Sequence, residues 1–235
     1  MDVSKYQTFA DQHFGGFSDI GLLITAFTHR SYINEHKKTA SEHNERLEFL
    51  GDAVLELVVT EHLYNNYKEP EGVLTNWRSA LVRTESISAA ADREGFESLL
   101  RLSRGERRAA SPRAREQILA NSYEAVIGAL YLDKGYEAAR EFISRTLLPV
   151  LPQILETGAW LDPKSRLQEL VQSHEDATPV YKVLSEEGPD HDKTFVVGVF
   201  VSNDLKGEGS GPSKQAAQVA AASTALQAYV THQPN

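Results

Sequence analysis

The chain has 235 residues, of which 41% are hydrophobic, enough to bury one large core or two smaller ones. It contains no cysteine, which excludes disulfides and thiolate-bound zinc or iron–sulfur sites. The 24 Lys and Arg against 33 Asp and Glu give a net charge of -9, which taken alone argues against a partner as anionic as nucleic acid.

The sequence predicts neither a membrane span nor an export signal. The first residues, MDVSKYQTFADQHF, lack the apolar core of a secretory signal. No stretch approaches the roughly 20 consecutive apolar residues that a membrane helix needs. We therefore expect a cytoplasmic protein without membrane association.

Up to about residue 156 the apolar residues recur at intervals of three and four, which is typical of helices. The pattern is clearest in residues 45–64, 75–96 and 115–135, and Gly72, Gly95 and Gly135 stand at plausible helix ends. This part of the chain predicts an all-α helical bundle.

The composition changes after Pro152. Residues 155–163 resemble a linker, and residues 164–174 predict a helix. Strand patterns follow at 179–187 and 193–203, with a turn at 188–192, then a short third strand, a Gly-rich loop at 206–213 and an Ala-rich helix at 213–230. This order predicts a small α+β (α-β-β-β-α) unit with both helices on one face of an antiparallel sheet.

The stretch HNERLEFLGD carries Glu45, Glu48 and Asp52 at helical positions i, i+3 and i+7, so three carboxylates share one face. Asn121 and Glu124 share a face of a second helix. Small residues in both segments, Gly51, Ala53, Ala125, Gly128 and Ala129, would let the two helices cross closely. Together these features predict a four-oxygen Mg²⁺ site of Glu48, Asp52, Asn121 and Glu124. Solvated helix faces remain the alternative.

These motifs carry a resemblance. HNERLEFLGDAVL and ILANSYEAVIGALYLD, with AFTHRSY and EGVLTNWRSALVR, resemble bacterial ribonuclease III. GPDHDKTF and GPSKQAAQVAA resemble the double-stranded RNA-binding domain that follows the nuclease domain in that family. The resemblance covers nearly the whole chain in the expected order. It implies an endonuclease and dimerisation domain at 1–156, a linker at 157–161 and an RNA-binding domain at 162–231.

The resemblance implies a homodimeric, Mg²⁺-dependent hydrolase, in which Mn²⁺ can substitute, that cuts double-stranded RNA to 5′-phosphate and 3′-hydroxyl ends in rRNA and mRNA precursor processing. Activation of water by the metal needs no covalent intermediate. Carried over by position, Asp52 and Glu124 are the catalytic acids, and Glu45 and Glu71 are second-tier acids near the site. Phe49 matches an aromatic at the dimer interface, and an ordinary core Phe remains the alternative for it.

One departure concerns Asn121, where the family most often has Asp. An amide oxygen is still a hard ligand but is neutral, so we expect a weaker hold on Mg²⁺. The alternative function is a duplex-RNA-binding protein whose nuclease activity is weakened or lost. Retention of Glu48, Asp52 and Glu124 argues against that alternative.

Basic and imidazole side chains need separate interpretation. Six arginines between residues 101 and 115 predict a cationic wall for RNA phosphates near the acidic site, with a mobile loop as the alternative. His29, His36 and His43 are spaced by seven, but their polar surroundings favour solvated or structural histidines over a metal stripe.

In the second domain the resemblance assigns Gln168 and Glu169 to one minor groove, His191 to the next, and Ser213 and Lys214 to phosphate. The family commonly has consecutive lysines where this chain has Lys214 and Gln215. Residues 159–235 hold six basic and ten acidic residues. We therefore expect this domain to bind duplex RNA weakly by itself.

Overall fold

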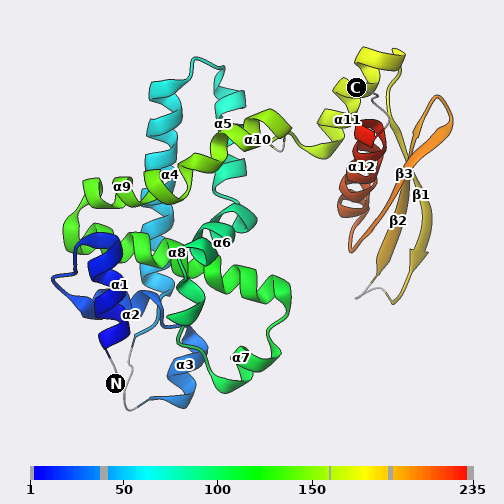
Figure 1. Cartoon of the computed structure of the whole chain (residues 1–235). Coiled ribbons are helices and arrows are strands. Elements are labelled where there is room, and N and C mark those ends of the chain that lie inside the picture. The colour runs from blue at the N-terminus through cyan, green and yellow to red at the C-terminus, as the bar shows by residue number, and fades with distance from the viewer. Residues whose placement is uncertain (1–2, 38–41, 159, 190–192, 232–235) are drawn as a thin grey trace. The chain divides into compact units, whose positions relative to one another are not determined.

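The computed structural model describes residues 3–37, 42–158, 160–189 and 193–231 (Figure 1). The chain divides into two compact units, Met1–Thr157 and Gly158–Asn235. Within the described ranges, no helix has the length and apolar character needed to span a bilayer.

The first unit is helical, as the sequence predicted. Its elements are α1 (Ser4–Phe14), α2 (Ile20–Ala26), α3 (Arg30–Glu35), α4 (Glu45–Asn66), α5 (Glu71–Leu81), α6 (Thr84–Arg93), η1 (Phe96–Ser98), α7 (Arg104–Ala109), α8 (Pro112–Lys134), α9 (Tyr136–Thr146), η2 (Leu148–Val150) and α10 (Leu151–Thr157). The periodic stretch at 75–96 is split between α5 and α6, because the backbone at Arg83 is extended. Helix α10 includes Thr157, which the sequence pattern placed in the linker.

Helix α8 is the centre of this unit. Ser111 caps its first turn, accepting a hydrogen bond from the backbone of Ala114, and Pro112 occupies the first helical position. From Ala125 to Leu130 every residue is buried. A helix that is apolar all round must be surrounded, and α4, α6, α2 and α9 pack against it (Figure 1).

The second unit has the predicted α-β-β-β-α order. Its elements are α11 (Pro163–Glu175), β1 (Val180–Glu187), β2 (Thr194–Val201), β3 (Asp204–Gly211) and α12 (Lys214–Thr231). The strands form an antiparallel sheet in the order β1-β2-β3. Ser202 and Asn203 both have positive φ in the β2–β3 turn. Val197, Val199 and Val201 of β2 face a core completed by α11 and α12.

The predicted Gly-rich loop at 206–213 is wrong, because β3 runs through Gly211. Gly207, Gly209 and Gly211 alternate along the strand on the face covered by α12. A Cβ at Gly207 would lie 2.6 Å from the backbone nitrogen of Ala225, and Cβ atoms at Gly209 and Gly211 would also overlap α12. The glycines therefore permit close strand–helix packing.

Candidate active site

Helices α4 and α8 cross through glycine. A Cβ on Gly51 would overlap the carbonyl oxygen of Glu124, and a Cβ on Gly128 would overlap the carbonyl oxygen of Leu47. The crossing through small residues that the sequence predicted is therefore confirmed. It brings the acidic face of α4 next to the face of α8 that carries Glu124.

The electrostatics of this crossing show a cluster of carboxylates. Burial raises the pKa of Glu124 to about 8, and the negative charges of Asp52, Glu48 and Glu56 act in the same direction. Burial also raises the pKa of Glu48, reinforced by Glu45 and Asp52. Acids from two helices therefore repel one another at one place on the surface.

The donor set suits a hard divalent cation. Oε2 of Glu48 is buried and has no hydrogen-bond partner, and Oδ1 of Asn121 accepts a 2.7 Å hydrogen bond from Nε2 of Gln117. Among the described residues, no three His, Asp or Glu side chains form a ready-made metal cage. Joint coordination would need rotamer changes, for which the exposed side chain of Asp52 has room. Carboxylate and amide oxygens with retained water ligands are the typical surroundings of Mg²⁺.

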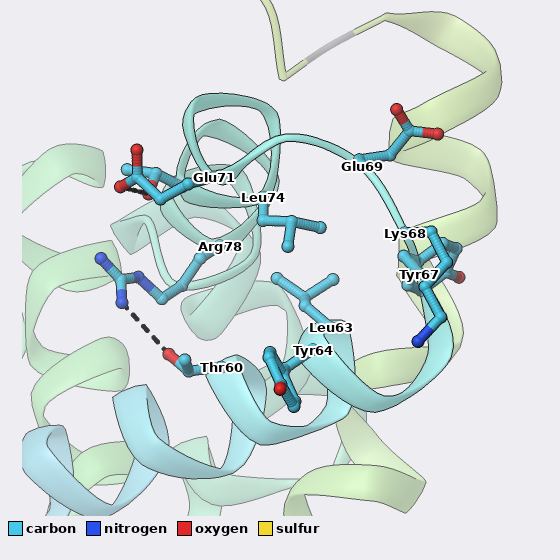
Figure 2. A pocket seen from close by; sticks show the side chains of 10 residues that line it. Thr60, Leu63, Tyr64, Tyr67, Lys68, Glu69, Glu71, Leu74 and Arg78 are labelled. Atoms are coloured by element: carbon cyan, nitrogen blue, oxygen red, sulfur yellow. Dashed lines mark hydrogen bonds between the residues drawn. The ribbon is translucent and has the colours of Figure 1, made fainter.

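The two second-tier acids differ, because the charge of Glu45 helps to raise the pKa of Glu48 whereas Glu71 contacts its own helix. Glu45 is 3.3 Å from Nη1 of Arg30 and 3.8 Å from Nδ1 of His43. Glu71, at the start of α5, accepts a 3.1 Å hydrogen bond from Oγ1 of Thr75. It lines a hollow of about 550 Å³ between the end of α4 and α5 (Figure 2).

Phe49 is 81% exposed on α4. The alternative of an ordinary core Phe is therefore wrong. Phe49 stands at the edge of a hollow of about 980 Å³, which is also lined by Leu22, Leu50 and Leu132. Leu132 is itself 54% exposed. An exposed aromatic next to an apolar hollow has the character of an interface.

Internal contacts engage several of the six arginines between residues 101 and 115. Arg101 is buried; its Nη1 donates to Oγ1 of Thr28 at 2.9 Å and its guanidinium stacks on Tyr32. Arg107 donates to the carbonyl of Leu100, and Arg115 pairs with Glu97. Four of the six remain exposed: Arg104, Arg107, Arg108 and Arg113. The prediction of six RNA-facing arginines is therefore wrong for Arg101, whose role is structural.

The three spaced histidines each contact a residue nearby in the chain. Nδ1 of His29 accepts from the backbone of Ser31 at the start of α3. His36 stacks on Tyr32 with ring centroids 3.9 Å apart. His43 lies beside Glu45, and its Nδ1 is buried without a hydrogen-bond partner.

Two residues near the site were missed by the sequence patterns. Glu56 follows Asp52 by one helical turn and contributes to the field at Glu124. Nε of Arg78, from α5, lies 2.9 Å from Oε2 of Glu56. The i, i+4 spacing could have indicated Glu56, whereas Arg78 meets it only through the tertiary fold.

The predicted RNA contacts of the second unit are only partly described. Gln168 and Glu169 are exposed on α11. Oγ of Ser213 accepts from the backbone of Ala216 and so caps α12. Lys214 is 3.1 Å from a carboxylate oxygen of Glu186. His191 lies outside the described residues.

Family models match both units. Residues 19–151 match the model described as Ribonuclease-III-like, and residues 163–229 match the double-stranded RNA binding motif. With the fold and the acidic site, these matches define the class, an endonuclease of double-stranded RNA with a separate RNA-binding domain.

Comparisons with whole proteins and with a solved structure point to the same class. The chain is 46% identical to Ribonuclease 3 of Streptococcus gordonii over 90% of both proteins. It is 44% identical to Ribonuclease 3 of Oceanobacillus iheyensis over 92% of this chain and 95% of that protein. A solved nuclease domain from Campylobacter jejuni matches 61% of this chain and 98% of its own length, with 35% identity and a TM-score of 0.53. The chain belongs to the ribonuclease III family.

Proposed function

We propose that the chain cleaves double-stranded RNA with Mg²⁺, or Mn²⁺ in its place, held by Glu48, Asp52, Asn121 and Glu124. The observation that carries this proposal is the glycine crossing of α4 and α8. It buries both Glu48 and Glu124 enough to raise the pKa of each carboxyl group, and the charges of Asp52 and Glu48 raise the pKa of Glu124 further. A cation between them would remove that repulsion.

The chemistry divides between the cation and the chain. When bound, a divalent cation supplies an activated water and charge stabilisation for the departing 3′-oxygen. Asp52 on α4 and Glu124 on α8 act as the catalytic acids. Their carboxylates would hold the cation and orient its water toward the RNA phosphate. Hydrolysis by water leaves 5′-phosphate and 3′-hydroxyl ends without a covalent enzyme intermediate, and structured rRNA and mRNA precursors are the proposed substrates.

Duplex cleavage on both strands also calls for two active sites, and we propose a homodimer. The exposed Phe49 and the hollow beside it would form a self-complementary contact about a two-fold axis. The related nuclease domain from C. jejuni has structural flexibility in a region involved in its dimer formation, so a dimeric relative supports this proposal. Glu45 and Glu71 remain second-tier acids in this proposal.

For the RNA-binding domain, 162–231, we propose that Gln168, Glu169, His191, Ser213 and Lys214 contact duplex RNA across its grooves. The ion pair of Lys214 with Glu186 and the excess of acidic residues in 159–235 support weak, salt-sensitive binding. The predicted linker at 157–161 shortens to 158–161 in this proposal, because Thr157 ends α10.

The test is cleavage of labelled duplex RNA by the full chain, in Mg²⁺ and in EDTA. We expect defined short products in Mg²⁺ only, and none from Glu124→Gln. Gel-shift binding in EDTA should be equal for both proteins. Cleavage in EDTA, or full activity of Glu124→Gln, contradicts the proposal.

A further inference from the structure

The acidic face of α4 continues beyond the proposed metal ligands. Glu48, Asp52 and Glu56 stand four residues apart, so their side chains follow one another along the helix surface. Glu56 therefore lies one helical turn beyond Asp52, on the face of α4 that carries the proposed ligands.

Arg78 holds Glu56 from a different helix. Its Nε lies 2.9 Å from Oε2 of Glu56, and its Nη1 donates to Oγ1 of Thr60 at 3.1 Å. Figure 2 shows the guanidinium of Arg78 reaching from α5 to Thr60 on α4. Because the guanidinium is planar, two contacts with α4 fix its direction and with it the direction of the Glu56 carboxylate.

The Arg78–Glu56 ion pair contributes too little to the stability of the fold for stability to be its main role. The side chains of Arg78 and Glu56 are 34% and 38% exposed. Ion pairs of that exposure contribute little to stability. Arg78 engages Oε2, so Oε1 of Glu56 remains as a further acceptor.

Magnesium usually keeps several of its waters, and groups that accept hydrogen bonds from such waters orient them. Here the proposed ligands include the neutral Asn121, so they carry one negative charge fewer than four carboxylates would. An oriented carboxylate one turn beyond Asp52 would restore negative charge without adding a ligand.

We propose that Glu56 is a positioning residue that Arg78 orients and that accepts hydrogen bonds from the hydration shell of the bound Mg²⁺. This inference rests on the proposed function. By this inference α5 contributes indirectly to metal binding, because its Arg78 orients Glu56.

The experiment measures metal binding and catalysis separately. Binding of Mn²⁺ to the full chain without RNA is followed by electron paramagnetic resonance, and cleavage of duplex RNA is titrated with Mg²⁺. We expect Glu56→Gln to weaken Mn²⁺ binding by about tenfold and to raise the Mg²⁺ midpoint by a similar factor. The rate at saturating Mg²⁺ should stay close to that of the wild type.

Variants of Arg78 test the orientation. Arg78→Ala should weaken Mn²⁺ binding as Glu56→Gln does, and Arg78→Lys should restore part of the loss because it keeps the charge but not the planar fork. In the Glu56→Gln background, Arg78→Ala should add nothing. Melting temperatures separate this result from a general loosening of α4 against α5.

Glu137 and Arg140 of α9 supply a matched control. Nε of Arg140 donates to Oε2 of Glu137 at 2.8 Å in an exposed ion pair, and neither residue belongs to the proposed site. Glu137→Gln and Arg140→Ala should leave both the Mn²⁺ affinity and the Mg²⁺ midpoint unchanged.

The outcomes separate the two levels of the proposal. If the wild type binds metal and cleaves but Glu56→Gln behaves identically, the role of Glu56 is wrong and the proposed function stands. If Arg78→Ala lowers the rate or the melting temperature without moving the metal midpoint, Arg78 is only a structural contact. If the wild type neither binds Mn²⁺ nor responds to Mg²⁺, both proposals fail.

Discussion

Glycine brings two backbones together at two places in this chain, with opposite consequences. At the α4–α8 crossing, Gly51 and Gly128 bring helices together whose neighbouring side chains include Glu48 and Glu124. At the β3–α12 contact, Gly207 and Gly209 bring a strand against a helix whose buried residues are mainly alanine.

The two contacts differ in the side chains that the close backbone approach brings together. In the nuclease unit it concentrates negative charge, which costs stability and which a bound cation would offset. In the RNA-binding unit it closes a small apolar core, which stabilises the fold directly. Close packing therefore serves the active site in one unit and the scaffold in the other.

Among the changes that test this comparison, Gly51→Ala should cause the largest loss of stability and activity. The new Cβ would meet the backbone of Glu124, which has no flexible end that can move away. We expect a loss of at least about 3 kcal/mol of unfolding free energy, at the upper end for overpacking, together with loss of cleavage. Chemical denaturation of the full chain measures the loss. Gly72→Ala is the control, because a Cβ there meets nothing within 4 Å; equal stability of the two variants contradicts the crossing.

Gly209→Ala should damage the other unit alone. Its Cβ would overlap the backbone of Ala220 and Ala221, and we expect a loss of about 2–3 kcal/mol confined to residues 158–231. Hydrogen exchange should increase across the second unit and remain unchanged within 42–157, and duplex-RNA affinity should fall. The exposed Ser210→Ala on the same strand serves as the control. Faster exchange in α4 or α8 is the result that contradicts this prediction.

Glu124→Gln should separate stability from activity. The folded-state pKa of about 8 lies above the ordinary value of 4.5, so ionised Glu124 is increasingly destabilising as the pH rises from 4.5 to 8. Gln cannot ionise. In EDTA at pH 8 the variant should therefore melt a few degrees above the wild type, and this advantage should disappear near pH 4.5. A variant that melts lower at pH 8 shows that Glu124 stabilises the fold through its charge.

The local sequence pattern was sufficient for much of the nuclease unit. Apolar spacing predicted α4 and α8, and small residues predicted their crossing, because both signals lie within single helices. The same pattern placed Phe49 among apolar neighbours, but spacing cannot tell an apolar face that meets the core from one that meets solvent. Only the fold shows that Phe49 is exposed.

The remaining differences arise from contacts between segments distant in sequence. Gly207, Gly209 and Gly211 have the local character of a loop, and only packing against α12 makes them a strand. Arg101 belongs to a basic run, yet its contacts with Thr28 and Tyr32 bury it. No local pattern encodes such partners.

Asn121→Asp should have the smallest effect on stability and activity. It tests what the α4–α8 crossing loses by having a neutral ligand at position 121. A fourth carboxylate strengthens the attraction for Mg²⁺, and a gain of about 1 kcal/mol would lower the Mg²⁺ midpoint for cleavage about fivefold. The same charge adds to the repulsion around Glu124, so the variant should melt lower than the wild type in EDTA. Gln117→Ala, which removes the hydrogen bond to Oδ1 of Asn121 without changing the charge, is the control. Identical Mg²⁺ curves for wild type and Asn121→Asp show that residue 121 does not hold the metal, which would leave Glu48, Asp52 and Glu124 as its ligands.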